Sequence, residues 1–444
     1  MTMDDQLNRR DMMKATGGSA LTAALAGCSS LIGGEDGNGN GGNGGNGGQQ
    51  QTDEVPDEPI QAGLQTFLEG APAVLGLQAQ YGAETAVRRI NEAGGVAGRE
   101  IELEVVEEAG AAIENYTRFV DEGKDVTFGP ISSGSHEQLL PVIEEQGVVN
   151  VSTDGTVSTL YEGEDPQYSF RAQNHDVMEA SAAARAAVAD LGAENIDTYA
   201  NINPDYAFGY DEREIFNAAI ENLTGAEEVY SGNPALGASD MSSHVTAVAN
   251  ESPDVLFTSC WGGDATLLLD QGQSQGLFDE VGVSVGTVWY GSVNDLGEDD
   301  IQGNLWGGSR NYYWGSPSME QWPPGQELYD EAQDEYGVVP TAHFMSGYAA
   351  VASWATATEK AAQLVGGYPS QEQIAATLEN HGFYTPAGYH TVAPNHQTYS
   401  TAHFGRIEWD DDRGHAVLED LEAIPPSHVS PPQGQVSLDW VNNW

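Results

Sequence analysis

From about residue 60 onwards, apolar residues recur along the chain with two alternating periods. Glu100–Val106 alternates apolar residues with carboxylates, which is typical of a strand with one face in water. Gly76–Ala93 instead carries apolar residues at helical spacing and ends at two glycines. Further strands are expected at Ile60–Phe67, Val126–Phe128, Val148–Val151, Ile196–Asn201, Glu228–Tyr230, Val255–Ser259 and Val281–Val288. Further helices are expected at Asn115–Glu122, Gly134–Gln146, Met178–Leu191, Asp211–Asn222, Ser242–Asn250, Ala265–Gln275, Gln326–Tyr336, Phe344–Leu364 and Gln371–Asn380.

This alternation predicts an α/β protein, because strands separated by helices of such length form parallel sheets with helices on both faces. Two sets of elements predict two Rossmann-like lobes, with crossings near Arg171–Asp176 and Leu305–Tyr313. Thr385–Trp409 is rich in Gly, Pro and His and is expected to be strand-like. The expected divisions are 59–175 and 308–384 for the two parts of lobe 1, 176–307 for the first part of lobe 2, and 385–444 for its second part with the C-terminal tail.

Two short signals precede this predicted folded body. Arg9-Arg10 stands before a short run rich in Ala and Gly, as in a twin-arginine export signal. Leu25-Ala26-Gly27-Cys28 is similar to a lipobox, in which small residues admit a signal peptidase and the thiol of the cysteine carries the lipid. We therefore expect a signal peptide at 1–27, a lipid on Cys28 and a Gly/Asn-rich acidic tether at 28–58. The protein is expected at the extracellular face of the cell membrane.

The charge of the chain restricts its partners. Lys and Arg total 15 against 68 Asp and Glu, a formal net charge of −53. This balance excludes a nucleic-acid partner, because phosphate binding needs a positive surface. A hydrophobic content of 39% excludes a disordered acidic chain. Molar salt shortens the Debye length to ~3 Å, so such a coat of carboxylates predicts a halophile's protein, with an acidic mesophilic protein as the alternative.

Candidate chemistry lies where predicted strands end, because ligands of open α/β sheets bind beyond the carboxyl ends of strands, at helix N-termini. The loop Gly129–Ser135 offers a glycine turn, hydroxyls and unpaired N–H groups for a carboxylate or another small acceptor. Helix capping by Ser133 or Ser135 is the alternative interpretation. Ser152–Thr156 is a second hydroxyl-rich loop, for which an ordinary polar turn is the alternative.

The corresponding loops of lobe 2 are rich in aromatic residues. They are Asn203–Gly209, Cys260–Asp264 and Trp289–Gly291. Aromatic side chains that face a cleft would cover an apolar or planar part of a ligand. Packing between helices is the alternative role of each ring.

Three stretches carry a resemblance to a known family: Arg89–Leu103 with its Asn91–Arg99 run, Phe128–Gly134, and Asp205–Gly209. They resemble the solute-binding proteins of ABC importers of the branched-chain amino acid (Leu/Ile/Val) type, a family that includes amide- and urea-binding relatives. The resemblance covers about 58–410. It implies two lobes joined by three crossing segments, a ligand cleft that closes about a hinge, and recognition of the closed form by a permease and its ATPase. No cofactor is expected, and no metal site either, because the sequence has no Cys-x-x-Cys and its histidines lack the spacing of metal ligands.

The resemblance also implies roles for single residues. Ser133 and Thr156 would bind the carboxylate of the ligand, and the backbone carbonyl of Asp154 would receive its ammonium group. Tyr206 or Phe208 matches the cleft aromatic of lobe 2. The remaining candidates for the site, from the aromatic loops, are Trp261, Asp264 and Tyr290.

One departure bears on the solute. Amino-acid binders of this type carry an acidic residue after the strand that matches Val281–Val288, where this chain has Trp289-Tyr290-Gly291. Asp264 and Asp295 are possible substitutes. An amino acid is the expected solute, and amides, urea-like solutes and carboxylates are the alternatives.

Two other functions compete with solute import. A ligand sensor of the same fold would pass its signal to a partner protein. For an enzyme, the Gly-x-Ser-x-Gly match at Gly272–Gly276 falls at the end of a predicted helix rather than on a strand-to-helix turn. Ser133 and His136 start one helix with no orienting acid. We therefore predict a binding protein and not an enzyme.

Overall fold

The computed structural model describes residues 55–163 and 166–444. The predicted signal peptide, Cys28 and most of the tether lie outside the described residues, so they stay predictions. None of the helices in the described ranges is both long enough and apolar enough to cross a membrane.

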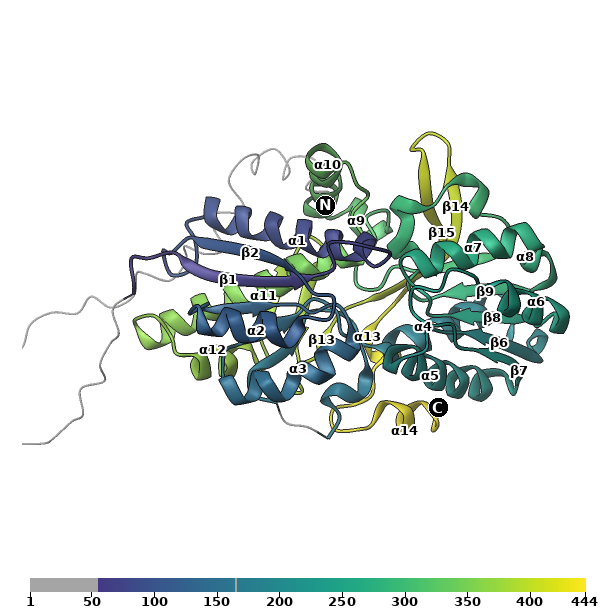
Figure 1. The fold of residues 1–444 in the computed structure, drawn as a ribbon, viewed down its shortest axis with the longest axis horizontal. Coiled ribbons are helices and arrows are strands. Elements are labelled where there is room, and N and C mark those ends of the chain that lie inside the picture. Colours follow the sequence, from purple (N-terminus) through teal and green to yellow (C-terminus); the bar gives the residue numbers. More distant parts are fainter. Residues whose placement is uncertain (1–54, 164–165) are drawn as a thin grey trace, which may run out of the picture. The chain divides into compact units, whose positions relative to one another are not determined.

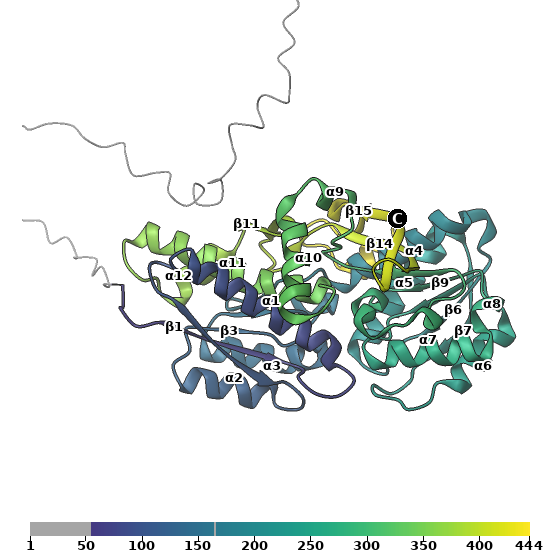
Figure 2. The ribbon, with the colours of Figure 1, turned by 90° about the horizontal axis from the view of Figure 1, so that it is seen from above.

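The first sheet has five strands in the order β2-β1-β3-β4-β5, and all neighbouring pairs are parallel. Figure 2 shows α1, α11 and α12 on one side of this sheet and α2 and α3 on the other. The strands are β1 (Ile60–Thr66), β2 (Ile101–Glu107), β3 (Val126–Phe128), β4 (Asn150–Ser152) and β5 (Ser169–Arg171). The helices are α1 (Ala73–Glu92), α2 (Ala112–Asp121), α3 (Ser133–Gln146), α11 (Ala342–Val365) and α12 (Gln371–Leu378).

The second sheet has seven strands in the order β15-β14-β10-β9-β8-β6-β7. Helices α4 and α5 cover one side, and α6, α7 and α8 cover the other (Figure 2). The strands are β6 (Thr198–Ile202), β7 (Glu227–Gly232), β8 (Val255–Thr258), β9 (Val283–Gly286), β10 (Leu305–Gly308), β14 (Ala402–Asp410) and β15 (His415–Ile424). The helices are α4 (Asp176–Leu191), α5 (Ala207–Thr224), α6 (Ser242–Glu251), α7 (Gly263–Gln275) and α8 (Leu277–Glu280).

Parallel sheets in two lobes are confirmed, with one correction at the edge of the second sheet. There, β14 pairs antiparallel with β10, and β15 pairs antiparallel with β14. The hairpin β14–β15 projects at the top of Figure 1. Four residues, Asp411–Gly414, join β14 directly to β15. So short a connection makes the two strands antiparallel, because a parallel pair needs a long crossover connection, usually a helix.

The chain passes between the sheets three times, after β5, after β10 and after β13. A small third sheet of β11 (Gly382–Thr385), β12 (Gly388–Val392) and β13 (Thr398–Tyr399) precedes the last pass. Phe383 and Val392 of this sheet pack into the core of the first lobe. The third pass therefore falls after β13, later than the residue 385 expected from the sequence, because a strand-like pattern does not say which lobe the strand joins.

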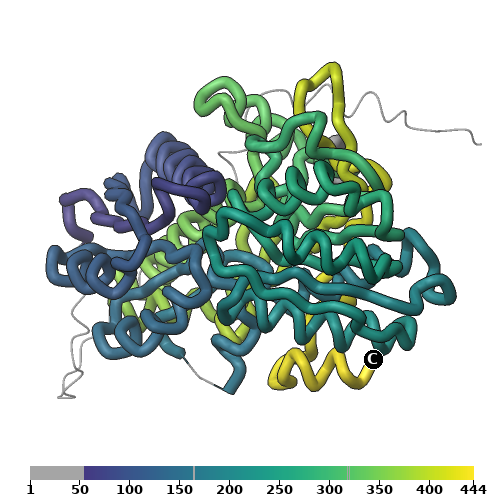
Figure 3. The backbone as a smooth tube through the Cα atoms, turned by 45° about the vertical axis from the view of Figure 1, so that its right-hand side comes forward, coloured from purple at the N-terminus to yellow at the C-terminus, as the bar shows by residue number. Residues whose placement is uncertain are grey.

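The remaining elements connect and cover these layers. Helices α9 (Pro317–Glu320) and α10 (Pro323–Tyr336) lie in the second pass. At the C-terminus, α13 (Pro426–Val429) packs on α4 and α14 (Ser437–Val441) packs on α5, where Figure 3 shows the yellow end of the chain beside the teal helices. Short 3-10 helices are η1 (Ser158–Tyr161), η2 (Ala193–Asn195), η3 (Trp289–Asp295) and η4 (Glu298–Asp300).

Helices α1 and α11 approach so closely that glycine is required at their contact. A Cβ on Gly82 would lie 1.8 Å from the carbonyl oxygen of Phe344, and a Cβ on Gly347 would lie 2.0 Å from that of Ala79. Backbone atoms on both sides leave nothing flexible to move aside. We expect Gly82→Ala to lower the free energy of unfolding by about 1–3 kcal/mol, the usual cost of overpacking.

Chemical denaturation tests this expectation. Gly134→Ala is the matched control, because a Cβ there has only the hydroxyl of Ser132 within 4 Å, at 3.9 Å. That control should change stability by no more than about 1 kcal/mol, the difference in helix propensity between Gly and Ala. Equal effects of the two substitutions would contradict the close contact.

Candidate functional site

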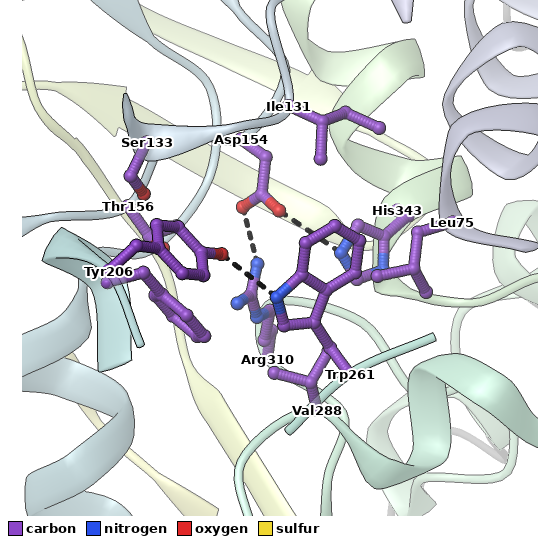
Figure 4. Close-up of a pocket in the computed structure, with 11 residues that line it drawn as sticks. Leu75, Ile131, Ser133, Asp154, Thr156, Tyr206, Trp261, Val288, Arg310 and His343 are labelled. Carbon is purple, nitrogen blue, oxygen red and sulfur yellow. Dashed lines mark hydrogen bonds and ion pairs between the residues drawn. The ribbon is translucent and has the colours of Figure 1, made fainter. Parts of the chain in front are cut away.

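A pocket lies where strands of both sheets end. Its walls follow β3 and β4 of the first sheet and β6, β8, β9 and β10 of the second, with one residue each from α1 and α11. The enclosed space between them is about 10 Å³, about the volume that one water molecule needs, so it holds no larger molecule in this arrangement. The lining residues are Leu75, Ile131, Ser133, Asp154, Thr156, Tyr206, Phe208, Trp261, Val288, Arg310 and His343 (Figure 4).

A buried carboxylate holds the loop before Ser133 in place. Glu108 accepts hydrogen bonds from the N–H groups of Ile131 (2.8 Å) and Ser132 (2.9 Å). Burial raises the pKa of Glu108 to about 7 despite these bonds. The hydroxyl that caps α3 belongs to Ser132, which accepts from the N–H of Ser135 at 3.4 Å. The capping role considered for Ser133 is therefore filled by its neighbour.

Asp154 links the two sides of the pocket through its side chain. Its Oδ1 forms an ion pair with Nη1 of Arg310, and its Oδ2 lies 3.2 Å from Nε2 of His343 (Figure 4). Arg310 follows β10 of the second sheet, and its Nε lies 2.8 Å from Oε2 of Glu179 on α4. The backbone carbonyl of Asp154, expected to receive an ammonium group, already accepts the hydroxyl of Ser152 at 2.7 Å. A carbonyl oxygen has a second lone pair, so its role toward an ammonium group stays a prediction, and the carboxylate of the same residue faces the pocket as well (Figure 4).

The charges of this cluster follow from its burial. Burial acts to raise the pKa of Asp154, but Arg310 and the hydrogen bond from His343 outweigh it and hold that pKa below its usual value. Burial lowers the pKa of His343 despite Asp154, and burial raises the pKa of Glu179 to about 8. The cluster thus pairs the Asp154 carboxylate with the Arg310 guanidinium, while burial favours the uncharged forms of His343 and Glu179.

Aromatic rings form the lobe 2 side of the pocket. Trp261 Nε1 donates to the hydroxyl of Tyr206 at 2.9 Å, which fixes both rings (Figure 4). The rings of Tyr206 and Phe208 are 6.0 Å apart, and those of Trp261 and Phe67 are 6.1 Å apart. Leu75, Ile131 and Val288 complete the apolar surface. The pocket thus has one charged end and one aromatic and aliphatic end.

The structure brings together six of the eight residues expected at the site: Ser133, Asp154, Thr156, Tyr206, Phe208 and Trp261. Asp264 and Tyr290 lie outside the pocket lining. Asp264 accepts from the N–H of Gly237 at 2.9 Å, beside the start of α7. Tyr290 is buried in the core of lobe 2, because η3 turns its hydroxyl toward the carbonyl of Ala416 and Nε1 of Trp314.

Five residues of the pocket lining were not predicted from the sequence, and two of them, Arg310 and His343, are polar. Arg310 lies in the predicted second crossing, where it is the one base between 302 and 319, and that isolated charge was a usable signal. His343 stands in the first turn of α11, which Thr341 caps by accepting from its N–H at 3.3 Å. Nothing in the local sequence distinguishes His343 from a core histidine.

Neither the Ser133–His136 pair nor the Gly-x-Ser-x-Gly match forms a catalytic arrangement. His136 is fully buried, and its Nε2 lies 3.0 Å from the hydroxyl of Ser169 rather than beside Ser133. Ser274 of the Gly-x-Ser-x-Gly match lies within α7 and donates to the carbonyl of Gln271. Across 55–163 and 166–444, no group of His, Cys, Asp and Glu is arranged to hold a metal ion.

Comparison with known proteins agrees with this geometry. The family model described as "Periplasmic binding protein" matches residues 59–414. Leu/Ile/Val-binding protein homolog 1 of Brucella suis biovar 1 (strain 1330) is 26% identical over 325 residues, which cover 72% of this chain and 82% of the relative. Leu/Ile/Val-binding protein BraC3 of Rhizobium johnstonii is 28% identical over 215 residues, or 48% of this chain, and the match spans 57% of that relative's length.

Solved structures share the fold. A solute binding protein of R. palustris, in complex with 4-hydroxybenzoate, superimposes with a TM-score of 0.73 at 17% identity and covers 85% of this chain and 100% of its own. The leucine binding protein LivK of Thermotoga maritima MSB8 gives a TM-score of 0.66 at 19% identity, with 83% and 99% covered. The chain belongs to the periplasmic binding protein family, of type 1.

Proposed function

We propose that this protein is the extracytoplasmic solute receptor of an ABC importer and closes its lobes on a small organic solute. The observation that carries the proposal is the pocket itself, because its walls come from the carboxyl ends of strands in both sheets. A solute that enters when the lobes part would contact both of them, so its binding energy favours an arrangement closed around it. That arrangement would then be the form a permease recognises.

Two classes of solute fit this proposal. The Leu/Ile/Val-binding names of the relatives favour an amino acid with an apolar side chain, for which Leu75, Ile131 and Val288 supply contacts. The aromatic end of the pocket favours a second candidate, an aromatic carboxylate like the 4-hydroxybenzoate of the R. palustris protein. Ser133 and Thr156 would bind the carboxylate in both cases. Amides, urea and a role as sensor remain further alternatives.

The location proposed for the protein follows from the same role. A receptor must stay near its permease, and a lipid on Cys28 with the tether 28–58 would keep the folded body there after twin-arginine export. The genes beside this one separate import from sensing, because permease genes support the proposal and a kinase gene supports the sensor.

Replacing both hydroxyl residues tests the site. The variant Ser133→Ala with Thr156→Ala should weaken binding of the solute by about 100-fold or more, because hydrogen bonds to charged groups contribute ~1.5–3 kcal/mol each. Calorimetry and thermal shift with leucine, valine, benzoate, acetamide and urea would measure this on the full chain. The exposed pair Thr159→Ala and Ser274→Ala is the control and should leave affinity unchanged. If none of these solutes binds the unaltered protein, the proposed function fails.

A further inference from the structure

We propose that the segment after β15, residues 425–444, holds the two lobes together and thereby sets how readily the cleft opens. The contact that does so is a hydrogen bond from the N–H of Ser437 to Oε1 of Glu162, at 2.8 Å, which we call the interlobe bond. The segment lies beyond residues 59–414, which match the family model. The consequence for solute affinity rests on the proposed function, whereas the effect on opening does not.

The donor of the interlobe bond is fixed on lobe 2. Ser437 is the first residue of α14, and Figure 1 shows this helix beside α5. Val441 at the other end of α14 is fully buried in the core of lobe 2, and its carbonyl accepts from Nδ2 of Asn222 on α5 at 3.1 Å. Val429 of α13 is also fully buried in that core. Because the segment is anchored on both sides of Ser437, this N–H moves with lobe 2.

The acceptor is fixed on lobe 1. Glu162 directly follows Tyr161, whose hydroxyl lies 3.0 Å from Oγ of Ser169 on β5. The guanidinium of Arg171, on the same strand, lies 4.9 Å from the centre of the Tyr161 ring. The carboxylate of Glu162 therefore moves with lobe 1. The interlobe bond thus joins two residues that are held in place on different lobes.

The short stretch 156–162 connects this bond to the pocket. Thr156 lines the pocket. Two residues further on, the N–H of Ser158 donates to Oδ2 of Asp211 on α5 at 2.7 Å, and its hydroxyl accepts from the N–H of Val177 on α4 at 2.9 Å. The pocket holds nothing larger than a water molecule in this arrangement, so a solute enters when the lobes part. Parting draws 156–162 away from lobe 2 and breaks the interlobe bond.

A contact that exists only in the closed arrangement shifts the equilibrium toward it. Hydrogen bonds to charged groups change an equilibrium constant by roughly one to two powers of ten. Glu162 is only partly buried, so the lower value applies. Loss of the interlobe bond should therefore make the solute-free protein more open, and should speed dissociation of a bound solute by about 10-fold.

Ser437→Pro removes the donor and suits the local backbone. Proline is favoured at the first position of a helix, and Val436 before it has the extended backbone (φ −71°, ψ 134°) that a residue preceding proline prefers. Small-angle X-ray scattering of the solute-free full chain should give a larger radius of gyration for this variant. Stopped-flow measurements with leucine and with benzoate should show the faster dissociation.

Glu162→Ala removes the acceptor and should cause the same two changes, also if the proline variant fails to fold. The double variant should add little to either single one, because both remove the same bond. Glu144→Ala is the matched control. The Glu144 carboxylate also accepts from backbone N–H groups, those of Gln167 and Tyr168 at 2.8 and 3.0 Å, but entirely within lobe 1. It should leave the radius of gyration and the dissociation rate unchanged.

A change in either quantity that Glu144→Ala does not share supports the interlobe bond. The inference is overturned if the folded variants at Ser437 and Glu162 keep both quantities of the unaltered protein, or if the control changes them equally. The proposed function survives either result. If no solute binds the unaltered protein, the proposed function fails, and the scattering comparison alone still decides on the interlobe bond.

Discussion

Replacing Arg310 by methionine is expected to lower the free energy of unfolding by about 3–5 kcal/mol, because it leaves buried charge without its partner. Arg310 is the positive group that faces both Asp154 and Glu179, and all three side chains are buried. Methionine fills a similar volume, so the loss reports the missing charge rather than a cavity. Urea unfolding at pH 8 measures the effect.

The pH dependence of this variant separates charge from packing. Without Arg310, Asp154 keeps the burial that raises its pKa and loses the charge that lowers it. The folded variant then binds a proton at Asp154 that the unfolded chain releases above its ordinary pKa near 3.8, so its stability falls as the pH rises from 5 to 8. The destabilisation by Arg310→Met should accordingly be smaller at pH 5 than at pH 8.

The control is Arg118→Met, which removes an exposed arginine that pairs with Glu104 and Glu122. Exposed pairs contribute about 0–1 kcal/mol, so this variant should stay close to the unaltered protein at both pH values. A loss at Arg310 that does not change with pH would mean that packing, and not the buried charge of Asp154, causes it.

Raising sodium chloride from 0.1 M to 2 M is expected to raise the unfolding midpoint by about 4 °C or more, which corresponds to about 3 kcal/mol for a folded body of this size. A net charge of −53 opposes compaction, and most of the few basic side chains already face a carboxylate. Salt shortens the Debye length from ~10 Å at 0.1 M to ~3 Å at 1 M, which screens the remaining repulsion. A differential calorimetry series in salt measures the change.

Neutralising exposed acids distinguishes screening from a general effect of salt on apolar surface. The substitutions Glu298→Gln, Asp299→Asn, Asp411→Asn and Asp412→Asn all lie at exposed positions. Together they should raise the midpoint at 0.1 M salt and leave it unchanged at 2 M, where the repulsion is already screened. An equal shift at both concentrations would show that the acidic coat is not the cause of the salt dependence.

The local pattern of apolar and polar residues was enough to predict the strands of the parallel sheets and the loops that follow them. Alternating apolar residues located the strands of both parallel sheets, and the hydroxyl loops after β3 and β4 lie at the pocket because parallel strands end at the same edge. The two loops were found in this way, and the resemblance to the solute-binding family singled out Ser133 and Thr156 within them. Both loops directly follow short buried strands, so the pattern that predicted each strand also predicted where the site loop begins.

The sequence did not predict the features that depend on contacts between residues far apart in the chain. Arg310 and His343 reach Asp154 from 156 and 189 residues away, and no local pattern records such a meeting. Tyr290 follows β9 as a site residue should, but η3 rotates its ring into the core. The antiparallel hairpin β14–β15 was likewise hidden, because strand periodicity does not specify direction.

The contact between α1 and α11 also governs when the first lobe can be completed. Gly82 and Gly347 lie in two facing helices, yet the ribosome makes them 265 residues apart. At ~5–20 residues per second, the apolar face of α1 and the first sheet would wait roughly 13–53 s for its covering helix. Completion of this lobe is therefore an event of the nearly finished chain, and during synthesis the growing protein must be kept from aggregating with its neighbours.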